Sequence, residues 1–415
     1  MKIGLVTDAW RPQTNGVVTT PPRTADCLRA LGHDVTLMTP AGLKSIPCPT
    51  YPEIRLALRS ARHVRDWLAR ERPDALHVAT EGPIGLAARN VALRAGLRFT
   101  TSYHTQFPQY LRARYPLPQS FWYRLLRAFH APAVRTMVGT KHVRRELRRK
   151  GFRHLVQWTR GVDTAAFRPQ PGVELHFPGP ILVYVGRVAV EKSVEDFCRA
   201  KTAGTKLVVG GGPALEHLRA RYPDVVVNGW KYGAELTRLL ACADCFVFPS
   251  RTDTFGLVML EAMACGLPVA AYPVTGPIDV VREGVTGCMR EDLSEAIEAA
   301  HRLERGPCRE QALEYGWENA THQFLDHLVE VRSHAAAQLP RWLRIEAAAK
   351  GDALPLRAGG ARRLAASATA VRASAAGRVA DVIAGGLQLV MTASPTRALH
   401  AVPPRARPCG GSSRS

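Results

Sequence analysis

Short apolar runs alternate with longer segments of helical periodicity along the first part of the chain. Runs typical of buried strands cover Lys2 to Val6, Asp34 to Met38, Ala75 to Val78 and Phe99 to Ser102. Helix-like segments such as Ala61 to Arg70 lie between them. Strands that alternate with helices are typical of a parallel sheet covered on both faces. This region is therefore predicted to form an α/β domain.

The same pattern restarts at Ile181, where five apolar residues end at Gly186. Its further strands are predicted at Lys206 to Val209, Val225 to Asn228, Cys245 to Phe248 and Pro268 to Ala271. The segment from Arg168 to Gly172 has the proline and glycine content of a linker. We therefore predict two Rossmann-like, doubly wound parallel-sheet domains, residues 1–168 and 172–331. The second is predicted to include a final crossover helix.

Two such domains in one chain place a cleft between the carboxyl ends of two sets of strands. Open α/β sheets bind their ligands at that edge. The pattern fits an enzyme that works in the cleft and equally a hinged binding protein. The choice between them depends on the residues at the strand ends.

The chain has 415 residues and a formal net charge of +21, which is unevenly spread. Residues 332–415 contain 13 Lys/Arg against 3 Asp/Glu, together with 22 alanines. We predict that they form a low-complexity basic tail, disordered or transiently helical, outside the globular body. This tail is either a weakly constrained extension or a basic arm for anionic lipid.

Composition excludes several other classes. An apolar share of 46% excludes a wholly disordered chain, and no apolar run reaches the ~18 residues that span a bilayer. The nine cysteines show no disulfide pattern, and the first residues turn polar too early for a signal peptide. We therefore expect a cytoplasmic protein, either free or peripheral on the inner face of the cell membrane. The positive charge raises nucleic-acid binding as an alternative, but interleaved aromatic platforms and known binding motifs are missing, so no nucleic-acid partner is expected.

Two cations lie five residues apart in the loop that follows the strand at Ile181. Arg187 offers a planar fork and Lys192 a compact charge. The start of the next helix adds backbone N–H donors for an anion. Because the loop lies at the ligand edge of a sheet, a phosphate-binding role is favoured over an ordinary pair of surface cations.

Two carboxylates accompany the helix that follows the strand at Cys245. Asp253 precedes the helix, and Glu261 lies about a turn inside it. Acids beside a phosphate site would repel the phosphate, so they are better explained as acceptors for sugar or ribose hydroxyls. The amides of Phe255, Gly256 and Leu257 would remain available at the helix start. A capped helix with solvated acids is the alternative.

One histidine, His104, follows the strand at Phe99, where it can donate or accept a hydrogen bond in the cleft. Cys242 and Cys245 have the spacing of a metal or redox pair. A second pair is missing, so buried thiols are favoured and no metal site is expected.

Several short motifs are specific when taken together. They include Asp8-Ala9-Trp10, Tyr103-His104-Thr105, Arg160-Gly161-Val162-Asp163 and the segment from Ser250 to Gly256. With them, nearly all of residues 1–331 resembles a glycosyltransferase of family 4, whose two-domain fold is called GT-B. Within this family the chain resembles bacterial GDP-mannose-dependent α-mannosyltransferases and glycolipid glycosyltransferases.

The resemblance implies a retaining enzyme that moves a hexose, mannose or glucose, from a nucleoside-diphosphate sugar to an acceptor hydroxyl of a glycolipid or glycan. It implies neither a cofactor nor a metal ion. For the diphosphate of the donor, the resemblance implies that Arg187 and Lys192 hold it and that Gly16 approaches it. It implies that Glu261 binds the ribose and that Asp253 and His104 face the donor sugar. The base pocket would be lined by Asn228, Gly229 and Trp230. His104, Arg187, Lys192 and Asp253 are the expected catalytic group. An epimerase of the same fold stays open as an alternative.

Residues 111–153 are strongly basic, with 12 Lys/Arg and a single acid, Glu146. Within them, Lys141 to Lys150 is a candidate for a basic helix. Apolar residues lie upstream at near-helical spacing, namely Phe121, Trp122, Leu125, Leu126 and Phe129. Aromatic residues beside a basic face are typical of an interfacial anchor, so we expect this segment to bind an anionic membrane surface. A core helix next to a solvated surface helix is the alternative.

Overall fold

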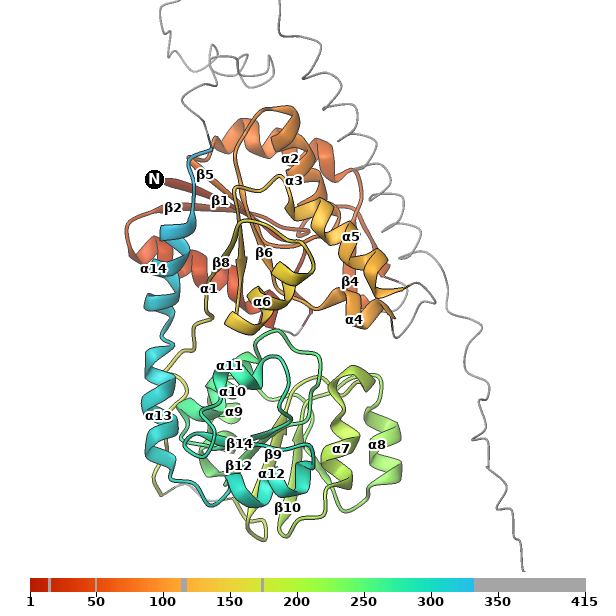
Figure 1. Cartoon of the computed structure of the whole chain (residues 1–415), viewed down its shortest axis with the longest axis vertical. Helices are drawn as coiled ribbons and strands as arrows, with labels where there is room; N and C mark the ends of the chain where they lie inside the picture. The colour runs from red at the N-terminus through yellow and green to blue at the C-terminus, as the bar shows by residue number, and fades with distance from the viewer. Residues whose placement is uncertain (14–15, 49–50, 113–117, 173–174, 332–415) are drawn as a thin grey trace, which may run out of the picture.

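The computed structural model describes residues 1–13, 16–48, 51–112, 118–172 and 175–331. Within these residues the chain forms two α/β domains, one above the other in Figure 1, each built on a six-stranded parallel sheet. The predicted fold class is confirmed. The tail predicted over residues 332–415 lies outside the described residues, as does the part of the basic segment at 113–117.

The first sheet has the strand order β2-β1-β5-β6-β7-β8. Its strands are β1 (Lys2–Val6), β2 (Asp34–Met38), β5 (Ala75–Val78), β6 (Thr100–Tyr103), β7 (Arg135–Val138) and β8 (Leu155–Gln157). The helices are α1 (Gly16–Ala30), α2 (Ser60–Glu71), α3 (Pro83–Arg94), α4 (Phe107–Arg112), α5 (Gln119–His130) and α6 (Lys141–Arg149). A separate antiparallel hairpin pairs β3 (Ser45–Cys48) with β4 (Tyr51–Ala57). The sequence pattern predicted neither this hairpin nor β7 and β8.

The second sheet has the strand order β11-β10-β9-β12-β13-β14. Its strands are β9 (Ile181–Val185), β10 (Thr205–Val209), β11 (Val226–Val227), β12 (Cys245–Phe248), β13 (Val269–Ala271) and β14 (Gly287–Met289). A 3₁₀ turn (Val190–Lys192) precedes the helices, which are α7 (Val194–Arg199), α8 (Leu215–Arg221), α9 (Gly233–Cys242), α10 (Leu257–Ala264), α11 (Pro277–Val280), α12 (Leu293–Ala300), α13 (Arg305–Glu314) and α14 (Trp317–His327).

The central strands are buried on both faces, which explains their continuous apolar sequences. Every residue of β9 and of β12 is buried. One face of this sheet packs under α10 and α13 and the other under α7 and α12. Two-sided burial removes the alternation of polar and apolar positions that marks a half-exposed strand. The carboxyl ends of these strands are thereby held rigidly at one edge of the domain.

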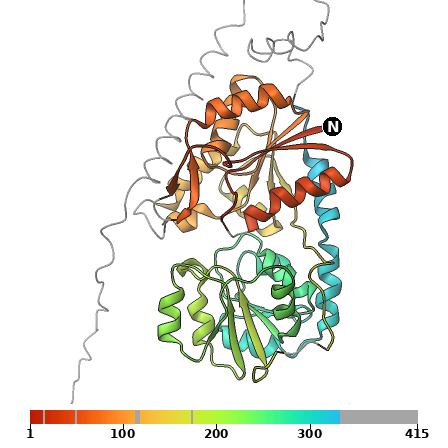
Figure 2. The ribbon, with the colours of Figure 1, turned by 180° about the vertical axis from the view of Figure 1, so that it is seen from behind.

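The last helix, α14, packs on the first domain. The Trp158 indole nitrogen donates to the Ala320 carbonyl oxygen at 2.9 Å, and the Phe324 ring lies 4.9 Å from that of Trp158. Beyond the helix, the Val331 amide donates to the Asp74 carbonyl oxygen at 2.7 Å. Figures 1 and 2 show α13 and α14 along one side of the molecule, with α14 beside α1. Residues 317–331, which the sequence groups with the second domain as a crossover helix, have the apolar face of α14 buried against the first domain.

Candidate functional site

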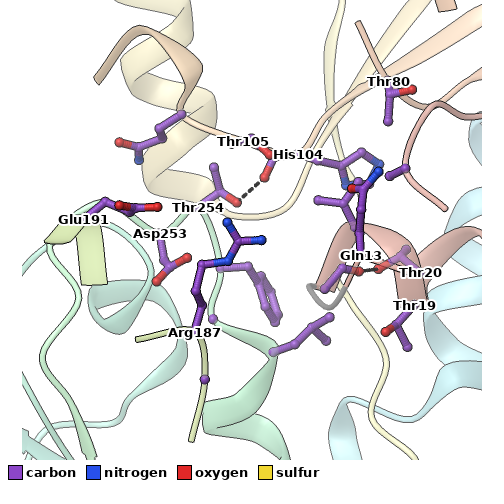
Figure 3. Close-up of a pocket in the computed structure, with 18 of the residues that line it drawn as sticks. Gln13, Thr19, Thr20, Thr80, His104, Thr105, Arg187, Glu191, Asp253 and Thr254 are labelled. Carbon is purple, nitrogen blue, oxygen red and sulfur yellow. Dashed lines mark hydrogen bonds between the residues drawn. The ribbon is translucent and has the colours of Figure 1, made fainter. Parts of the chain in front are cut away.

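A cavity of about 610 Å³ lies between the carboxyl ends of the two sheets. Residues that follow β1, β5 and β6 line it from the first domain, and residues that follow β9 and β12 line it from the second. Figure 3 shows both groups around one space, with His104 and Thr80 on one side and Arg187 and Asp253 on the other. The cleft predicted from two doubly wound domains in one chain is therefore present.

The loop after β9 brings both predicted cations to this cavity. Arg187 and Lys192 line it, and the Tyr184 hydroxyl donates to the Arg187 carbonyl oxygen at 2.7 Å. Tyr184 is buried within β9. A hydrogen bond from a side chain of the sheet thus holds the backbone of Arg187 in place.

A glycine-rich turn after β10 supports this loop. Gly210 has a φ of 148°, and a Cβ there would lie 1.8 Å from the Gly186 carbonyl oxygen, so only glycine allows the two loops to approach. The Val188 amide donates to the Gly211 carbonyl oxygen at 2.9 Å. The turn packs against the cation loop, and Val209, the last residue of β10, lines the cavity.

Lys192 and Asp253 bind each other. The Lys192 Nζ donates to both carboxylate oxygens of Asp253, at 2.6 and 2.8 Å. The side chains are 23% and 18% exposed, so water screens the pair only partly. The structure thus brings together two residues that we assigned to different parts of the donor. Asp253 orients the lysine and offsets part of its charge.

The start of α10 faces the cavity. Gly256 precedes the helix with a φ of 82° and, being glycine, has no side chain to cap the first turn. Phe255, Gly256 and Leu257 all line the cavity. Across the cleft, a Cβ on Gly16 at the start of α1 would lie 2.9 Å from Leu257 Cδ1. Backbone N–H groups at the start of α10 can therefore bind an anion between the domains.

Glu261 reaches the same cavity from inside α10. Burial raises the pKa of its carboxyl to about 7. The group therefore changes between the neutral and the ionised form near neutral pH. An ionised carboxylate there could accept hydrogen bonds from two neighbouring hydroxyls of a ligand.

His104 is buried and connects the two domains. Its carbonyl oxygen accepts a hydrogen bond from the Thr254 hydroxyl at 2.6 Å, across the cleft (Figure 3). Its Nδ1 lies 3.0 Å from Nη2 of Arg160. Burial and the neighbouring guanidinium hold the imidazole pKa well below its usual value. His104 is therefore neutral at physiological pH.

Part of the first-domain side of the cavity is apolar, next to polar lining residues such as Asp8, Thr80 and Gln106. Side chains from β4, α3, α4 and α5 line it, namely Ile54, Leu56, Pro83, Phe107, Trp122, Leu125, Leu126 and Phe129. One acid, Glu81, lies among them, and its carboxylate is 3.2 Å from Nε2 of buried His130. This apolar compartment can hold a hydrophobic group next to the polar donor side.

The expected aromatic anchor is wrong. Trp122 and Phe129 are 2% and 1% exposed and belong to the first-domain core, and Phe121 packs against that core. Side chains that fill a core and line a cavity cannot also insert into a bilayer. The alternative reading of α5, a core helix beside the basic surface helix α6, is the one that the structure supports.

The predicted base pocket is only partly present. Trp230 lines the cavity, whereas Asn228 and Gly229 are not among its lining residues. Tyr232, which the sequence analysis missed, also lines it and stacks on Trp230 with ring centroids 6.2 Å apart and planes 13° from parallel. Two partly exposed aromatic rings at a cavity rim can stack on a nucleotide base.

Arg160, Gln106 and Gln13 also line the cavity and were not assigned to it from the sequence. All three are buried. Arg160 was visible as part of a motif, but burial of an arginine cannot be read from that motif. Gln106 lies two residues after His104, and no pattern separated it from an ordinary loop residue.

Within the described ranges, no group of three or more His, Cys, Asp or Glu side chains is arranged to hold a metal ion. No helix in the same part of the chain is long and apolar enough to cross a bilayer.

Comparison with known proteins identifies the family. Residues 14–166 match the family model described as Glycosyltransferase Family 4, and residues 179–305 match that described as Glycosyl transferases group 1. The chain is 27% identical over 399 residues to a GDP-mannose-dependent alpha-mannosyltransferase of Corynebacterium glutamicum, covering 83% of this chain and 95% of the relative. It is 29% identical over 343 residues to a sulfoquinovosyl transferase of Arabidopsis thaliana, covering 71% of this chain and 66% of the plant protein.

Solved structures share the architecture. A sucrose-phosphate synthase from Thermosynechococcus elongatus superimposes with a TM-score of 0.63 at 21% identity, over 78% of this chain and 97% of the other. An Anabaena protein in complex with UDP and glucose superimposes with a TM-score of 0.59 at 15% identity, over 79% and 98% of the two chains. At such low identity these likenesses concern the fold. With family models matching in both of its domains, the chain belongs to glycosyltransferase family 4 and has the two-domain GT-B fold.

Proposed function

We propose that this protein transfers a hexose, with retention of configuration, from a nucleoside-diphosphate sugar to a hydroxyl of an acceptor that has an apolar part. The observation that carries the proposal is the composition of one cavity. It joins a cation loop and an open helix start in the second domain to an apolar compartment in the first. A polar sugar nucleotide and a hydrophobic acceptor could meet there.

In such a reaction the largest change in charge occurs on the departing diphosphate. In this proposal Arg187, Lys192 and the amides at the start of α10 take up the charge that develops on it. Groups held in place before the reaction stabilise such charge without reorganisation. Because they are supplied by the chain itself, we propose that the reaction needs no metal ion.

The sugar and the ribose occupy the space between these groups. Glu261 would accept hydrogen bonds from the ribose hydroxyls, and Asp253 and His104 would contact the transferred sugar. Attack on the face from which the diphosphate departs lets a diphosphate oxygen accept the proton of the acceptor hydroxyl. No protein base is then required, and the configuration at the sugar is retained.

Relatives suggest which donor to test first. Three relatives at 27–28% identity are GDP-mannose-dependent mannosyltransferases. We therefore propose GDP-mannose, with the guanine near the stacked rings of Trp230 and Tyr232. UDP-glucose is the comparison donor, because it was found in a solved structure of the same architecture.

We also propose that the protein works at an anionic membrane surface, on the cytoplasmic side, where a lipid acceptor would be available. In this proposal α6 is the basic element that makes the contact. Its cations Arg145, Arg148 and Arg149 are exposed, while Val143 and Leu147 hold its other face in the core. The contact would be electrostatic rather than aromatic.

Ligand binding tests the donor half of the proposal. GDP, GDP-mannose, UDP and UDP-glucose would each be added to the full-length protein in a thermal-shift assay. A ligand at 100 times its dissociation constant stabilises the folded state by about 2.7 kcal/mol, so at least one donor should raise the melting temperature clearly. The rise should shrink in Lys192→Ala. Absence of any rise, with calorimetry also showing no heat of binding, would contradict the proposal.

A further inference from the structure

Arg160 is a buried arginine beside the reaction cavity. It is 4% exposed, follows β8 and lines the cavity. Its Nη1 donates to the Trp158 carbonyl oxygen at 2.9 Å, and its guanidinium carbon lies 4.4 Å from the centre of the Trp158 ring. Within the described part of the chain, no ion pair joins it to a carboxylate. Its position therefore needs an explanation other than a salt bridge.

The contact between Arg160 and His104 has only one possible direction. A protonated guanidinium carries N–H donors and no acceptor, and although burial lowers the pKa of Arg160 to about 9, the group stays protonated at neutral pH. Nη2 must therefore donate to Nδ1 of His104 across their 3.0 Å separation. Nδ1 then carries a lone pair, and the proton of the neutral imidazole sits on Nε2.

The Nε2 atom of His104 is buried and has no hydrogen-bond partner within the described residues. A buried N–H donor without a partner costs free energy, and native structures satisfy nearly all of them. His104 lines the cavity, so a ligand there can supply the missing acceptor. The donor sugar of the proposed reaction has oxygens that fit this role.

We infer that Arg160 is a positioning residue that fixes His104 as the Nε2–H tautomer, so that the imidazole donates a hydrogen bond to an oxygen of the bound sugar. The identity of the ligand rests on the proposed function. The tautomer does not, because it is a property of the ligand-free protein. His104 then acts as a fixed neutral donor rather than as a proton-transfer group.

The groups around His104 support this assignment. The charged or titratable neighbours that act on it are Arg160, His77 and His130. None of them is an acid, so nothing there favours a second proton on the imidazole. The Trp158 ring, whose centre is 5.9 Å from that of His104, packs on it edge to face and limits rotation. The tautomer and the orientation of the ring are thereby set together.

Nitrogen NMR tests the tautomer directly. Full-length protein labelled with ¹⁵N-histidine would be recorded between about pH 5.5 and 8, the range in which an ordinary histidine titrates. His104→Gln identifies the signal. We expect an imine-like Nδ1 and an amine-like Nε2 whose shifts stay constant. A protonated Nδ1, or a His104 signal that titrates in this range, would overturn the inference whether or not the protein binds a sugar nucleotide.

Binding of GDP-mannose and of GDP tests the consequence. Arg160→Met should weaken GDP-mannose about tenfold, the effect of roughly one hydrogen bond, and change GDP less than about twofold. Combining it with His104→Ala should add little further loss, because both changes remove the same contact. Arg160→Lys, which keeps an N–H donor, should restore part of the affinity.

Arg309→Met is the matched control. Arg309 donates to the carbonyl oxygens of Phe167, Ala264 and Thr164 away from the cavity. Its loss should therefore lower the melting temperature, and it should not weaken binding of GDP-mannose more than binding of GDP. Equal losses for both ligands in Arg160→Met, or fully additive losses with His104→Ala, would overturn the positioning role. Failure of the wild-type protein to bind either ligand would instead count against the proposed donor.

Discussion

The ion pair between Lys192 and Asp253 determines what each side chain can do in the cavity. Before a ligand arrives, the carboxylate holds the ammonium group at 2.6 Å. A diphosphate would have to share the lysine with this acid. Removing the lysine therefore has two effects, since a cation disappears and an unpaired carboxylate remains beside the phosphate site.

We predict that Arg187→Ala and Lys192→Ala each lower turnover by at least ~100-fold, the scale of losing one preorganised charge. Lys192→Ala should also weaken binding of the nucleoside diphosphate more than Lys192→Ala combined with Asp253→Asn, because the double variant lacks the repelling carboxylate. Calorimetry and turnover measurements check both statements. Lys201→Ala, which removes an exposed cation of the same domain, should behave like wild type. Wild-type activity in both single variants would contradict the phosphate role.

The raised pKa of Glu261 predicts that the affinity for GDP depends on pH. Its folded-state pKa is raised to about 7 by burial, so the carboxyl is neutral below this pH and ionised above it. The ionised form is the better acceptor for two ribose hydroxyls. Affinity for GDP should therefore rise as the pH increases through about 7 and fall as the pH decreases, as measured by calorimetry.

Glu261→Gln is the control for this dependence, because the amide does not titrate. The variant should bind GDP more weakly at pH 8 and show only the pH dependence of the diphosphate itself. The same slope in both proteins would mean that Glu261 does not contact the nucleotide.

At the scale of elements, α6 is the best candidate for membrane contact. The Thr140 hydroxyl accepts from the Val143 amide at 3.2 Å and so caps the helix start. Val143 and Leu147 are buried, while Arg145, Arg148 and Arg149 are exposed. Each cation near an anionic surface contributes about 1 kcal/mol, so reversing three of them should have a large effect.

We predict that the protein binds vesicles containing anionic lipid at low salt and that high salt releases it. Changing Arg145, Arg148 and Arg149 to Glu should abolish most of this binding in a sedimentation assay, with or without residues 332–415. The same reversal of three exposed cations on α2, Arg62, Arg65 and Arg70, is the matched control and should have a smaller effect. Loss of binding only on deletion of residues 332–415 would assign the contact to the tail.

The elements show which parts of the fold were predictable. Strands β1, β2, β5 and β12 have the predicted bounds. In β1, β5 and β12 burial on both faces leaves a plain apolar run, whereas the edge strand β2 is only partly buried. Strand β8 was missed because its residues are only partly buried, and β14 because Gly287 opens a three-residue strand. The spacing of apolar residues in α5 revealed a helix but not that its apolar face would line a cavity, which depends on packing between distant segments.

The candidate site was predictable to a similar extent. Arg187, Lys192, Asp253 and Glu261 follow strands at a recognisable edge, so topology brings them together. The pairing of Lys192 with Asp253, and the burial of Arg160 against His104, result from contacts between residues far apart in the sequence. Local patterns do not specify such contacts.

At the scale of the whole molecule, hydrogen bonds join the two domains both at the cavity and away from it. The Thr254 hydroxyl donates to the His104 carbonyl oxygen, and the His142 amide donates to the Asp279 carboxylate at 2.8 Å. The first bond lies at the cavity and the second away from it. Closure of a cleft excludes water that would otherwise hydrolyse an activated donor.

We predict that Thr254→Val, which keeps the shape of the side chain and removes the hydroxyl, raises hydrolysis of the donor relative to transfer by a few-fold. The melting temperature should change little, because one hydrogen bond contributes about 1 kcal/mol. Asp279→Ala, which removes the acceptor of the other bond, should leave the ratio of hydrolysis to transfer unchanged. An unchanged ratio in Thr254→Val would show that this bond does not control closure.

The central claim is that the cavity transfers a sugar from a nucleotide to a hydroxyl on a hydrophobic acceptor. The direct measurement is release of nucleoside diphosphate from GDP-mannose and from UDP-glucose, with and without diacylglycerol, long-chain alcohols and alkyl glycosides dispersed in detergent. We expect one donor to be consumed faster when an acceptor is present, a glycosylated acceptor that keeps the donor's anomeric configuration, and loss of both in Lys192→Ala. Consumption of neither donor, with every acceptor recovered unchanged, would contradict the account.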